Sequence, residues 1–254
     1  MIWAKRAFVI LSLLAAWGLC AQAGLFNAYL LPPPGKIAAL AGRMLLDGSL
    51  WQNIRISLAR VVTGFGIAFA LAFPLAVLLG LNRACFELLE TPLEFVRHIP
   101  PLATTPLLIL WLGIGEGSKL AVIVLATFFP IFLNTVSGVT QCDKGLIEVG
   151  HVLGLGRLER IRRIVLPAAL PVIIVGMRLG LGYSWRALIG AELLAATAGL
   201  GYMIIEAEEL ARPDMVLVGI IAIGLLGHLL DGVFSRVTRR LIPWQRAEAA
   251  YEQA

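Results

Sequence analysis

Two long stretches of the chain, Val61–Leu81 and Leu120–Val139, contain no charged residue. A helix rises 1.5 Å per residue, so each stretch is long enough to cross the hydrocarbon core of a bilayer, which is about 30 Å thick. The composition agrees with this: 59% of the residues are hydrophobic and 15% are charged, and the mean hydropathy is +0.87. Soluble domains are roughly 45–50% apolar and 25% charged. We therefore predict an all-α, polytopic membrane protein.

Four further apolar segments bring the prediction to about six transmembrane helices. The first, Ala7–Phe26, follows Lys5 and Arg6. It is either a cleaved signal peptide, since Ala21-Gln22-Ala23 resembles a cleavage site, or a retained first helix. We favour the retained helix, because the chain that follows is itself apolar. The other three segments are Arg97–Ile114, which its prolines should break, a helix that begins near Pro167, and Met215–Phe234.

The segments divide the chain into three predicted parts. Residues 1–58 hold the first helix and, after the break Leu31-Pro32-Pro33-Pro34-Gly35, an external amphipathic segment; residues 59–240 form the core transmembrane domain; residues 241–254 form a cytoplasmic tail. Within the core, small residues recur at every fourth position: Gly64, Ala68, Ala72, Ala76 and Gly80. Such a stripe lets helix backbones approach closely in lipid, either within one subunit or between two.

The loop at residues 141–166 is the longest polar interruption between the apolar segments. Asp143 is placed to cap a short helix, and Gly154 is a natural stop for it. A second amphipathic pattern begins at Arg157, and Pro167 marks the start of the next helix. Connections between helices are commonly about 2–8 residues, so this longer loop should have a partner. The alternative is that its basic helix lies on anionic lipid.

The spacing within this loop resembles the cytoplasmic EAA loop of permease subunits in binding-protein-dependent ABC importers. The family pattern is Glu-Ala-Ala, three residues, Gly, nine residues, Ile-x-Leu-Pro; the chain keeps this spacing, with Val149 and Gly150 in place of the alanines. In the family this loop forms a coupling helix that docks on the ATPase, and Val149 and Gly150 are small enough to keep it close to that partner. The resemblance implies such a role for Glu148, Val149, Gly150, Gly154, Leu155, Gly156, Ile164, Leu166 and Pro167.

Two other segments extend the resemblance to nearly the whole chain. The break at Leu31–Gly35 resembles the LPSP-type segment of the nitrate, sulfonate and taurine branch, and Arg97–Ile114 resembles its R-x-x-P-x-x-A-x-x-P-L segment. The resemblance implies a bacterial inner-membrane permease for a small anion such as a sulfonate, taurine or nitrate. It also implies a second permease copy in a homodimer, a separate ATPase subunit that binds ATP and Mg, and a periplasmic or lipid-anchored solute-binding protein.

Other functions remain as alternatives. The same resemblance covers permeases for thiamine precursors and other small organic solutes. A secondary transporter driven by an ion gradient would need acidic or histidine relays inside the membrane, which are scarce here, and a lipid-binding scaffold would leave the loop spacing unexplained. No enzyme site or cofactor is expected, since no P-loop or HExxH motif is present. The net charge of +5 could suggest nucleic-acid binding, but we expect no nucleic-acid partner. Cys20, Cys85 and Cys142 are expected to be small buried hydrophobic residues.

A few polar residues inside the last two segments are candidates for the solute pathway. Arg178 lies 11 residues beyond Pro167, which is roughly 16 Å along a helix and near the bilayer midplane. It either holds an oxyanion with its planar donors or pairs structurally with a carboxylate or helix carbonyls, and both interpretations stay open. The other pathway candidates are Ser184, Trp185, Arg186 and Glu192. Glu192 is expected at the outer surface, in water or against the binding protein, and His228 with Asp231 is expected to form an interfacial polar pair.

The distribution of positive charge predicts the orientation. With six spans and the N-terminus inside, thirteen of the 21 Lys and Arg residues fall in inside segments, five fall outside and three lie in or at the edges of spans. Positive residues concentrate on the cytoplasmic side of membrane proteins. We therefore predict a cytoplasmic location for both termini and for the loop at residues 141–166, without using the family resemblance.

Overall fold

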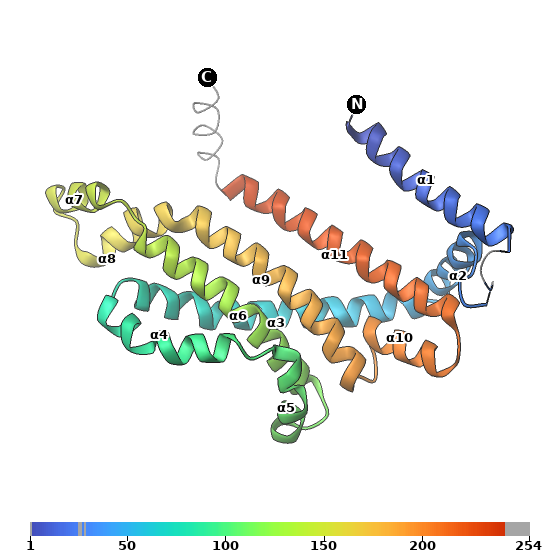
Figure 1. The fold of residues 1–254 in the computed structure, drawn as a ribbon. Helices are drawn as coiled ribbons and strands as arrows, with labels where there is room; N and C mark the ends of the chain where they lie inside the picture. Colours follow the sequence, from blue (N-terminus) through green and yellow to red (C-terminus); the bar gives the residue numbers. More distant parts are fainter. Residues whose placement is uncertain (1, 25–26, 28, 242–254) are drawn as a thin grey trace. The chain divides into compact units, whose positions relative to one another are not determined.

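The protein is described by a computed structural model that covers residues 2–24, 27 and 29–241. Within these ranges every regular element is a helix, which confirms the all-α prediction (Figure 1). The chain forms two compact units. Of the described residues, those up to 58 and those at 192–226 form unit 1, and those at 59–191 and 227–241 form unit 2. Residues 242–254 lie outside the described ranges, as does Phe26, where the first predicted span ends.

Four described helices are long and apolar enough to cross a membrane, or five if the bent pair α4 and η1–α5 counts as one span. The four lie at Ser49–Gly80, Glu116–Thr140, Arg157–Glu209 and Pro213–Arg240. The remaining predicted span, Ala7–Phe26, corresponds to α1 (Ile2–Gln22). Within the described part of α1, residues Leu11–Gln22 form an apolar helical stretch, and this stretch is shorter than the other spans. These helices confirm a multi-pass membrane fold.

The small-residue stripe of α3 (Ser49–Gly80) packs against α6 (Glu116–Thr140) within unit 2. Ala68, Ala72 and Ala76 are fully buried. A methyl group added at Gly64 would lie 2.5 Å from Cγ2 of Ile123, and one added at Gly80 would lie 3.0 Å from Cγ1 of Val139. Both contacts are with α6, so the stripe brings two helices of the same chain together.

Prolines break the next predicted span, as expected. Helix α4 (Arg83–Arg97) ends before Pro100, and the 3-10 turn η1 (Pro101–Thr104) leads into α5 (Thr105–Leu112). The pair is bent by 80°. Proline removes a backbone donor and its ring clashes with the preceding turn, so a straight helix cannot continue here. Leu108 of α5 then packs with Val122 of α6 and Ala187 of α9 (Leu166–Ala195).

Helix α9 lies close to α6 along its length (Figure 1). At Gly138 an added methyl group would lie 3.0 Å from the carbonyl oxygen of Ala169, and at Gly176 it would lie 2.9 Å from that of Pro130. Backbone atoms therefore meet across this contact, and only glycine fits. In its C-terminal third α9 also carries Trp185, whose indole packs on Gly227 of α11 (Pro213–Leu241).

Unit 1 contains α1, α2 (Pro34–Leu46), α10 (Leu200–Glu209) and the adjoining parts of α3, α9 and α11. The predicted amphipathic segment Ile37–Leu58 is divided between α2 and α3 by a turn at Gly48, whose φ is +84°. The Asp47 carboxylate accepts a hydrogen bond of 2.9 Å from the Ser49 backbone, which starts α3. The predicted domain boundary after residue 58 falls inside α3, and the three-part division remains a prediction.

Candidate functional site

The loop between α6 and α9 contains helix α7 (Lys144–Val152), and local hydrogen bonds set both of its ends. The Asp143 carboxylate accepts a hydrogen bond of 2.6 Å from Gly145 N, as the predicted cap should. At the other end, Gly154 N donates to His151 O at 2.9 Å and Leu155 N donates to Gly150 O at 3.0 Å. This pair of bonds is the Schellman motif, and it requires the left-handed φ of +69° found at Gly154.

The second half of the loop continues directly into α9. Helix α8 (Arg157–Arg160) begins where the sequence pattern restarts, and it runs through one π-helical segment, η2 (Ile161–Val165), into α9. Helix α9 begins at Leu166, one residue before the predicted start at Pro167, but no break separates it from η2. In the π turn, Leu166 N donates to Ile161 O, five residues earlier. This turn contains one extra residue and accommodates Pro167, which has no N–H to donate, so the helix continues through it.

Gly150 faces the inside of the loop. A methyl group at this position would lie 2.6 Å from Cδ1 of Ile164 and 3.1 Å from Cγ of Arg160. The glycine therefore allows α7 to pack against the second half of the same loop, and this corrects the prediction that its small size serves an external partner. Val149, the other departure from the Glu-Ala-Ala pattern, is exposed.

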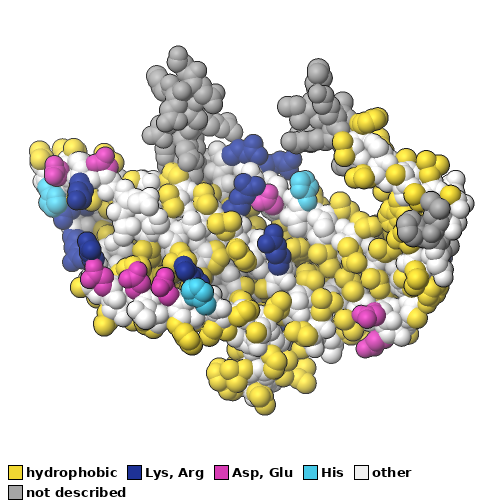
Figure 2. All heavy atoms as spheres, viewed as in Figure 1, with side chains coloured by type: hydrophobic (Ala, Val, Ile, Leu, Met, Phe, Trp, Pro, Cys, Tyr) yellow, Lys and Arg dark blue, Asp and Glu magenta, His cyan; other side chains and the backbone are white. Residues whose placement is uncertain are grey.

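Five large apolar side chains remain exposed on this loop, and we call them the loop surface: Leu146, Val149, Val152, Leu153 and Leu158. Glu148, His151 and Arg157 lie exposed among them. In Figure 2, acidic, basic and histidine side chains gather with hydrophobic ones at the end of the molecule where Figure 1 labels α7 and α8. An exposed apolar group with a charged rim is typical of a protein-binding surface.

Arg178 forms a bidentate ion pair between α9 and α11. Its Nε and Nη2 donate to the two carboxylate oxygens of Asp231, both at 2.7 Å. The structure therefore contains the carboxylate partner that one interpretation of Arg178 required, and Arg178 is the hydrogen-bonded partner of Asp231. The side chains are 53% and 48% exposed on the chain surface.

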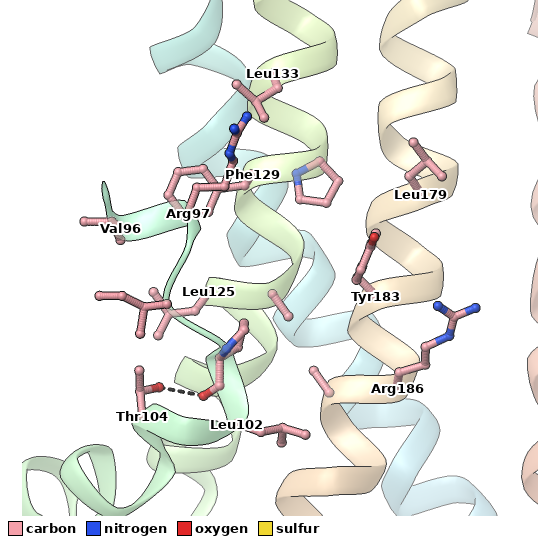
Figure 3. A pocket seen from close by; sticks show the side chains of 15 residues that line it. Val96, Arg97, Leu102, Thr104, Leu125, Phe129, Leu133, Leu179, Tyr183 and Arg186 are labelled. Atoms are coloured by element: carbon pink, nitrogen blue, oxygen red, sulfur yellow. Dashed lines mark hydrogen bonds between the residues drawn. The ribbon is translucent and has the colours of Figure 1, made fainter. Parts of the chain in front are cut away.

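A cavity of about 510 Å³ lies beside α9 in unit 2, between α9 on one side and α4, η1 and α6 on the other (Figure 3). Apolar side chains form most of its wall, including Leu102, Leu125, Phe129 and Leu179. Its polar side chains are those of Arg97, Thr104, Tyr183 and Arg186. In Figure 3 the Arg186 guanidinium points away from Arg97. Among the described residues Arg186 makes no ion pair, whereas Arg97 lies 3.7 Å from Glu94.

Only one of the five pathway candidates, Arg186, lines this cavity. Ser184 is fully buried and its hydroxyl donates to Leu181 O at 2.8 Å, and Trp185 is buried against α11. Sequence reasoning missed Arg97 and Tyr183 as wall residues. Arg97 was read only as part of the family segment, although the proline break that follows it was a signal that the backbone turns toward α9.

Comparison with known proteins identifies the family. Residues 72–243 match the family model of the binding-protein-dependent transport system inner membrane component. The chain belongs to this family. The permease is 35% identical over 245 residues to the putative aliphatic sulfonates transport permease of Bacillus subtilis, covering 96% of this chain and 89% of that protein. It is 37% identical over 237 residues to the taurine transport system permease of Escherichia coli, covering 91% and 86%.

Further relatives widen the range of solutes and support the fold. The permease is 35% identical over 185 residues to the bicarbonate transport system permease of Synechococcus elongatus, covering 72% of this chain and 66% of that protein. Its fold is similar to that of a chain in the inward-facing MetNI methionine ABC transporter, with a TM-score of 0.67, 17% identity and coverage of 77% and 97%. The coupling-loop and pathway roles of individual residues remain predictions.

Glu192 lies inside unit 1 of the permease, and the expectation that water surrounds it is wrong. The side chain is 1% exposed. Its carboxylate accepts hydrogen bonds from Ser57 Oγ at 2.8 Å and from Gly201 N at 2.9 Å. Ser57 Oγ in turn accepts from Leu200 N at 2.9 Å. The cluster thereby satisfies free N–H groups in the first turn of α10, where a negative charge also interacts well with the helix dipole.

We expect Glu192→Ala to destabilise the permease strongly. The substitution leaves the buried Gly201 N–H without its acceptor and Ser57 Oγ without its carboxylate, at about 1–3 kcal/mol for each buried group that loses its partner. Glu192→Gln keeps one acceptor oxygen and should destabilise less. Thermal unfolding of the detergent-solubilised protein should rank the wild type above Gln and Gln above Ala; equal midpoints for all three would contradict this role.

A second charged cluster, at the start of α6, could not have been found from the sequence. Arg60 is 6% exposed and binds the Glu116 carboxylate through two hydrogen bonds of 2.7 and 2.6 Å, while the buried Lys119 ammonium lies 3.0 Å from the same carboxylate. The spacing of three between Glu116 and Lys119 is visible in the chain, but Arg60 is 56 residues away. The cluster holds α3 and α6 together beside the small-residue stripe.

Proposed function

We propose that the chain is the permease subunit of an ATP-driven importer and that it forms the translocation pathway for a small anionic solute. Two copies would form the pathway as a homodimer. A separate ATPase subunit, which binds ATP and Mg, would dock on the coupling loop, and a periplasmic or lipid-anchored binding protein would deliver the solute. ATP binding would move the loop, and α9 would carry that movement into the membrane.

The geometry of the loop carries this proposal. Helix α7 is fixed at both ends by its own hydrogen bonds, packs on α8 and η2 through Gly150, and leaves the loop surface exposed. Helix η2 joins α8 to α9 without a break. A displacement of α7 would therefore be transmitted to the membrane-spanning helix α9 through the contact of α7 with α8 and η2. A loop that only rested on lipid would need neither the fixed α7 nor the tight contact at Gly150.

The names of the relatives support an anionic solute. The three relatives described above are named as permeases for aliphatic sulfonates, taurine and bicarbonate. These solutes share an oxyanion group, so we propose a sulfonate, taurine, nitrate or bicarbonate as the solute here. Arginine, whose planar donors fit oxyanions, appears both in the cavity wall and on the neighbouring face of α9.

Reconstitution tests the proposal. The permease is inserted into liposomes with the ATPase and binding protein of its own system, and ATP hydrolysis is measured while ethanesulfonate, taurine, nitrate, bicarbonate and a thiamine precursor are added in turn. We expect one of the anions to stimulate both hydrolysis and uptake. Stimulation by the thiamine precursor alone would replace the anion by an organic solute, and uptake that needs no ATPase and follows an ion gradient would overturn the proposal.

The proposed orientation, with the loop and both termini in the cytoplasm, can be tested with the natural cysteines. Cys85 at the start of α4 is exposed, whereas Cys142 beside the loop is buried, and Cys20 is half-buried. Burial, and then the neighbouring Asp143, raise the pKa of the Cys142 thiol. Because the thiolate is the reactive form, Cys142 should react slowly even where reagent reaches it. The finding for Cys85 corrects the expectation that all three cysteines are buried.

In a Cys20→Ser background, a membrane-impermeant maleimide should modify Cys85 in inside-out vesicles and leave it unmodified in right-side-out vesicles. Cys142 should become reactive only after the protein is denatured. Mass spectrometry of the peptides gives the extent of modification at each site. Modification of Cys85 from the outer face alone would reverse the proposed orientation.

A further inference from the structure

The ion pair between Arg178 and Asp231 joins two candidate membrane-spanning helices of unit 2. Arg178 is twelve residues from the start of α9 at Leu166, and Asp231 is ten residues from the end of α11 at Leu241. At 1.5 Å per residue these distances are roughly 18 and 15 Å. Both side chains therefore lie more than two turns inside helices that are long and apolar enough to cross a membrane.

The exposure of the pair is unusual for this depth. The two side chains are 53% and 48% exposed on the surface of the chain, whereas Arg60 in the other bidentate pair is 6% exposed. Charged groups at mid-membrane are costly in contact with lipid and face the protein interior or water instead. The face of α9 and α11 that carries Arg178 and Asp231 is therefore not a lipid-facing surface.

The surface of α9 beside Arg178 is exposed and borders residues that line the cavity. Gly182 lies one turn beyond Arg178, and no atom lies within 4 Å of the position that its Cβ would occupy. Leu179, which directly follows Arg178, lines the cavity together with Tyr183 and Arg186. Arg178 and Arg186 are eight residues apart on α9, roughly 12 Å along the helix, so two guanidinium groups border one open strip with Gly182 between them.

We propose that Arg178 is an intramembrane binding site for the oxyanion group of the solute, and that Asp231 occupies the guanidinium when no solute is present. This inference rests on the proposed function, and it assigns the substrate class to a residue. A carboxylate and an oxyanion such as sulfonate present two acceptor oxygens to the same planar donors. A passing oxyanion can thus replace Asp231 at Nε and Nη2 without a change in the donor geometry.

Because the pair is half-exposed, the free-energy cost of opening it is small. Pairs that are accessible to water contribute about 1 kcal/mol or less, because water replaces the partner when the pair opens. When the solute takes the guanidinium, the Asp231 carboxylate is left facing the open strip, with His228 one turn earlier on α11. Asp231 then limits how tightly the anion is held, so that the site can release it, as a conducting site requires. The exposure of Arg178 is the observation that separates it from the buried, structural Arg60.

The test measures anion binding by the purified full-length permease through its thermal unfolding midpoint, since a ligand that binds only the folded state raises that midpoint. Ethanesulfonate is the probe. Ethyl methyl sulfone is the uncharged control of similar size, and sodium chloride keeps the ionic strength constant. The variants are Asp231→Asn, which removes the competing carboxylate, and Arg178→Ala/Asp231→Ala, which removes both charges and leaves no unpaired charge in the membrane. Glu116→Gln is the matched change in the structural pair.

We expect ethanesulfonate, but not the sulfone, to raise the midpoint of the wild type. Asp231→Asn should reach the half-maximal shift at roughly threefold to tenfold lower concentration, in keeping with the loss of a pair worth about 1 kcal/mol. The double variant should show no shift, although its midpoint without anion stays near that of the wild type. Glu116→Gln should lower the midpoint without anion and keep the ethanesulfonate shift.

Three results would overturn the proposal: no shift in the wild type up to about 0.1 M ethanesulfonate, an unchanged concentration dependence in Asp231→Asn, or a full shift in the double variant. If the double variant does not fold, Asp231→Asn alone decides, because it keeps Arg178. The measurement needs no ATPase and no binding protein. Failure of ATP-driven uptake in the wild type would therefore count against the proposed function, and loss of the predicted shifts would count against this site.

Discussion

Gly154→Val is expected to lower the affinity of the permease for its ATPase by tenfold or more and to suppress ATP-driven uptake to the same degree. Gly154 has a φ of +69° and its amide completes the Schellman motif at the end of α7. In the left-handed φ/ψ region, a residue with a Cβ is less stable than glycine by about 1–2 kcal/mol, and a β-branched residue is less stable still. Helix α7 should then lose its last turn, and the loop surface should lose its fixed shape.

The loop supplies two matched comparisons for this prediction. Gly156→Ala changes a glycine whose φ is −63° and whose Cβ would meet no atom within 4 Å, so it should bind ATPase like the wild type. Gly150→Leu tests packing in place of backbone conformation, since even its Cβ would lie 2.6 Å from Ile164. Co-purification of the ATPase and its hydrolysis rate are the measurements. Equal binding by all three variants would show that the shape of α7 does not matter for docking.

Gly64→Val is expected to give the largest loss of stability among substitutions in α3. Its Cβ would lie 2.5 Å from Cγ2 and 2.9 Å from Cβ of Ile123, and a Cβ atom cannot move aside without moving the α6 backbone. Overpacking of this kind costs about 1–3 kcal/mol, occasionally more. Because α3 and α6 meet along the whole small-residue stripe, the contact near Arg60 and Glu116 should weaken as well.

Gly66→Val is the control for this change. Gly66 lies two residues further along the same helix and has no atom within 4 Å of its Cβ position, so the difference in helix propensity is the same and the clash is absent. The unfolding midpoint in detergent should fall for Gly64→Val and stay within a few degrees of the wild type for Gly66→Val. Equal midpoints would mean that α3 and α6 do not depend on their close approach.

The features predicted correctly from the sequence are those that neighbouring residues fix. Uncharged apolar runs identify the membrane helices, the prolines at 100 and 101 identify the break after α4, and Asp143 and Gly154 identify the ends of α7. Each depends on hydrogen bonds or steric limits within about five residues. The family pattern of the loop was visible for the same reason, since its spacing reflects one local helix–turn–helix structure.

The tertiary structure alone decided which polar groups meet. Ser57 and Glu192 are 135 residues apart, and Arg178 and Asp231 are 53 apart. Which side of each helix faces its neighbour depends on how side chains interlock along the full contact, and a small rotation changes every pair. For this reason Glu192 was placed in water instead of in a buried cluster, and Gly150 was assigned to an outside partner instead of to Ile164. The sequence determined that this chain crosses the membrane and carries a long loop with the spacing of the family; packing between distant helices determined which of its charges are buried in clusters and which are exposed.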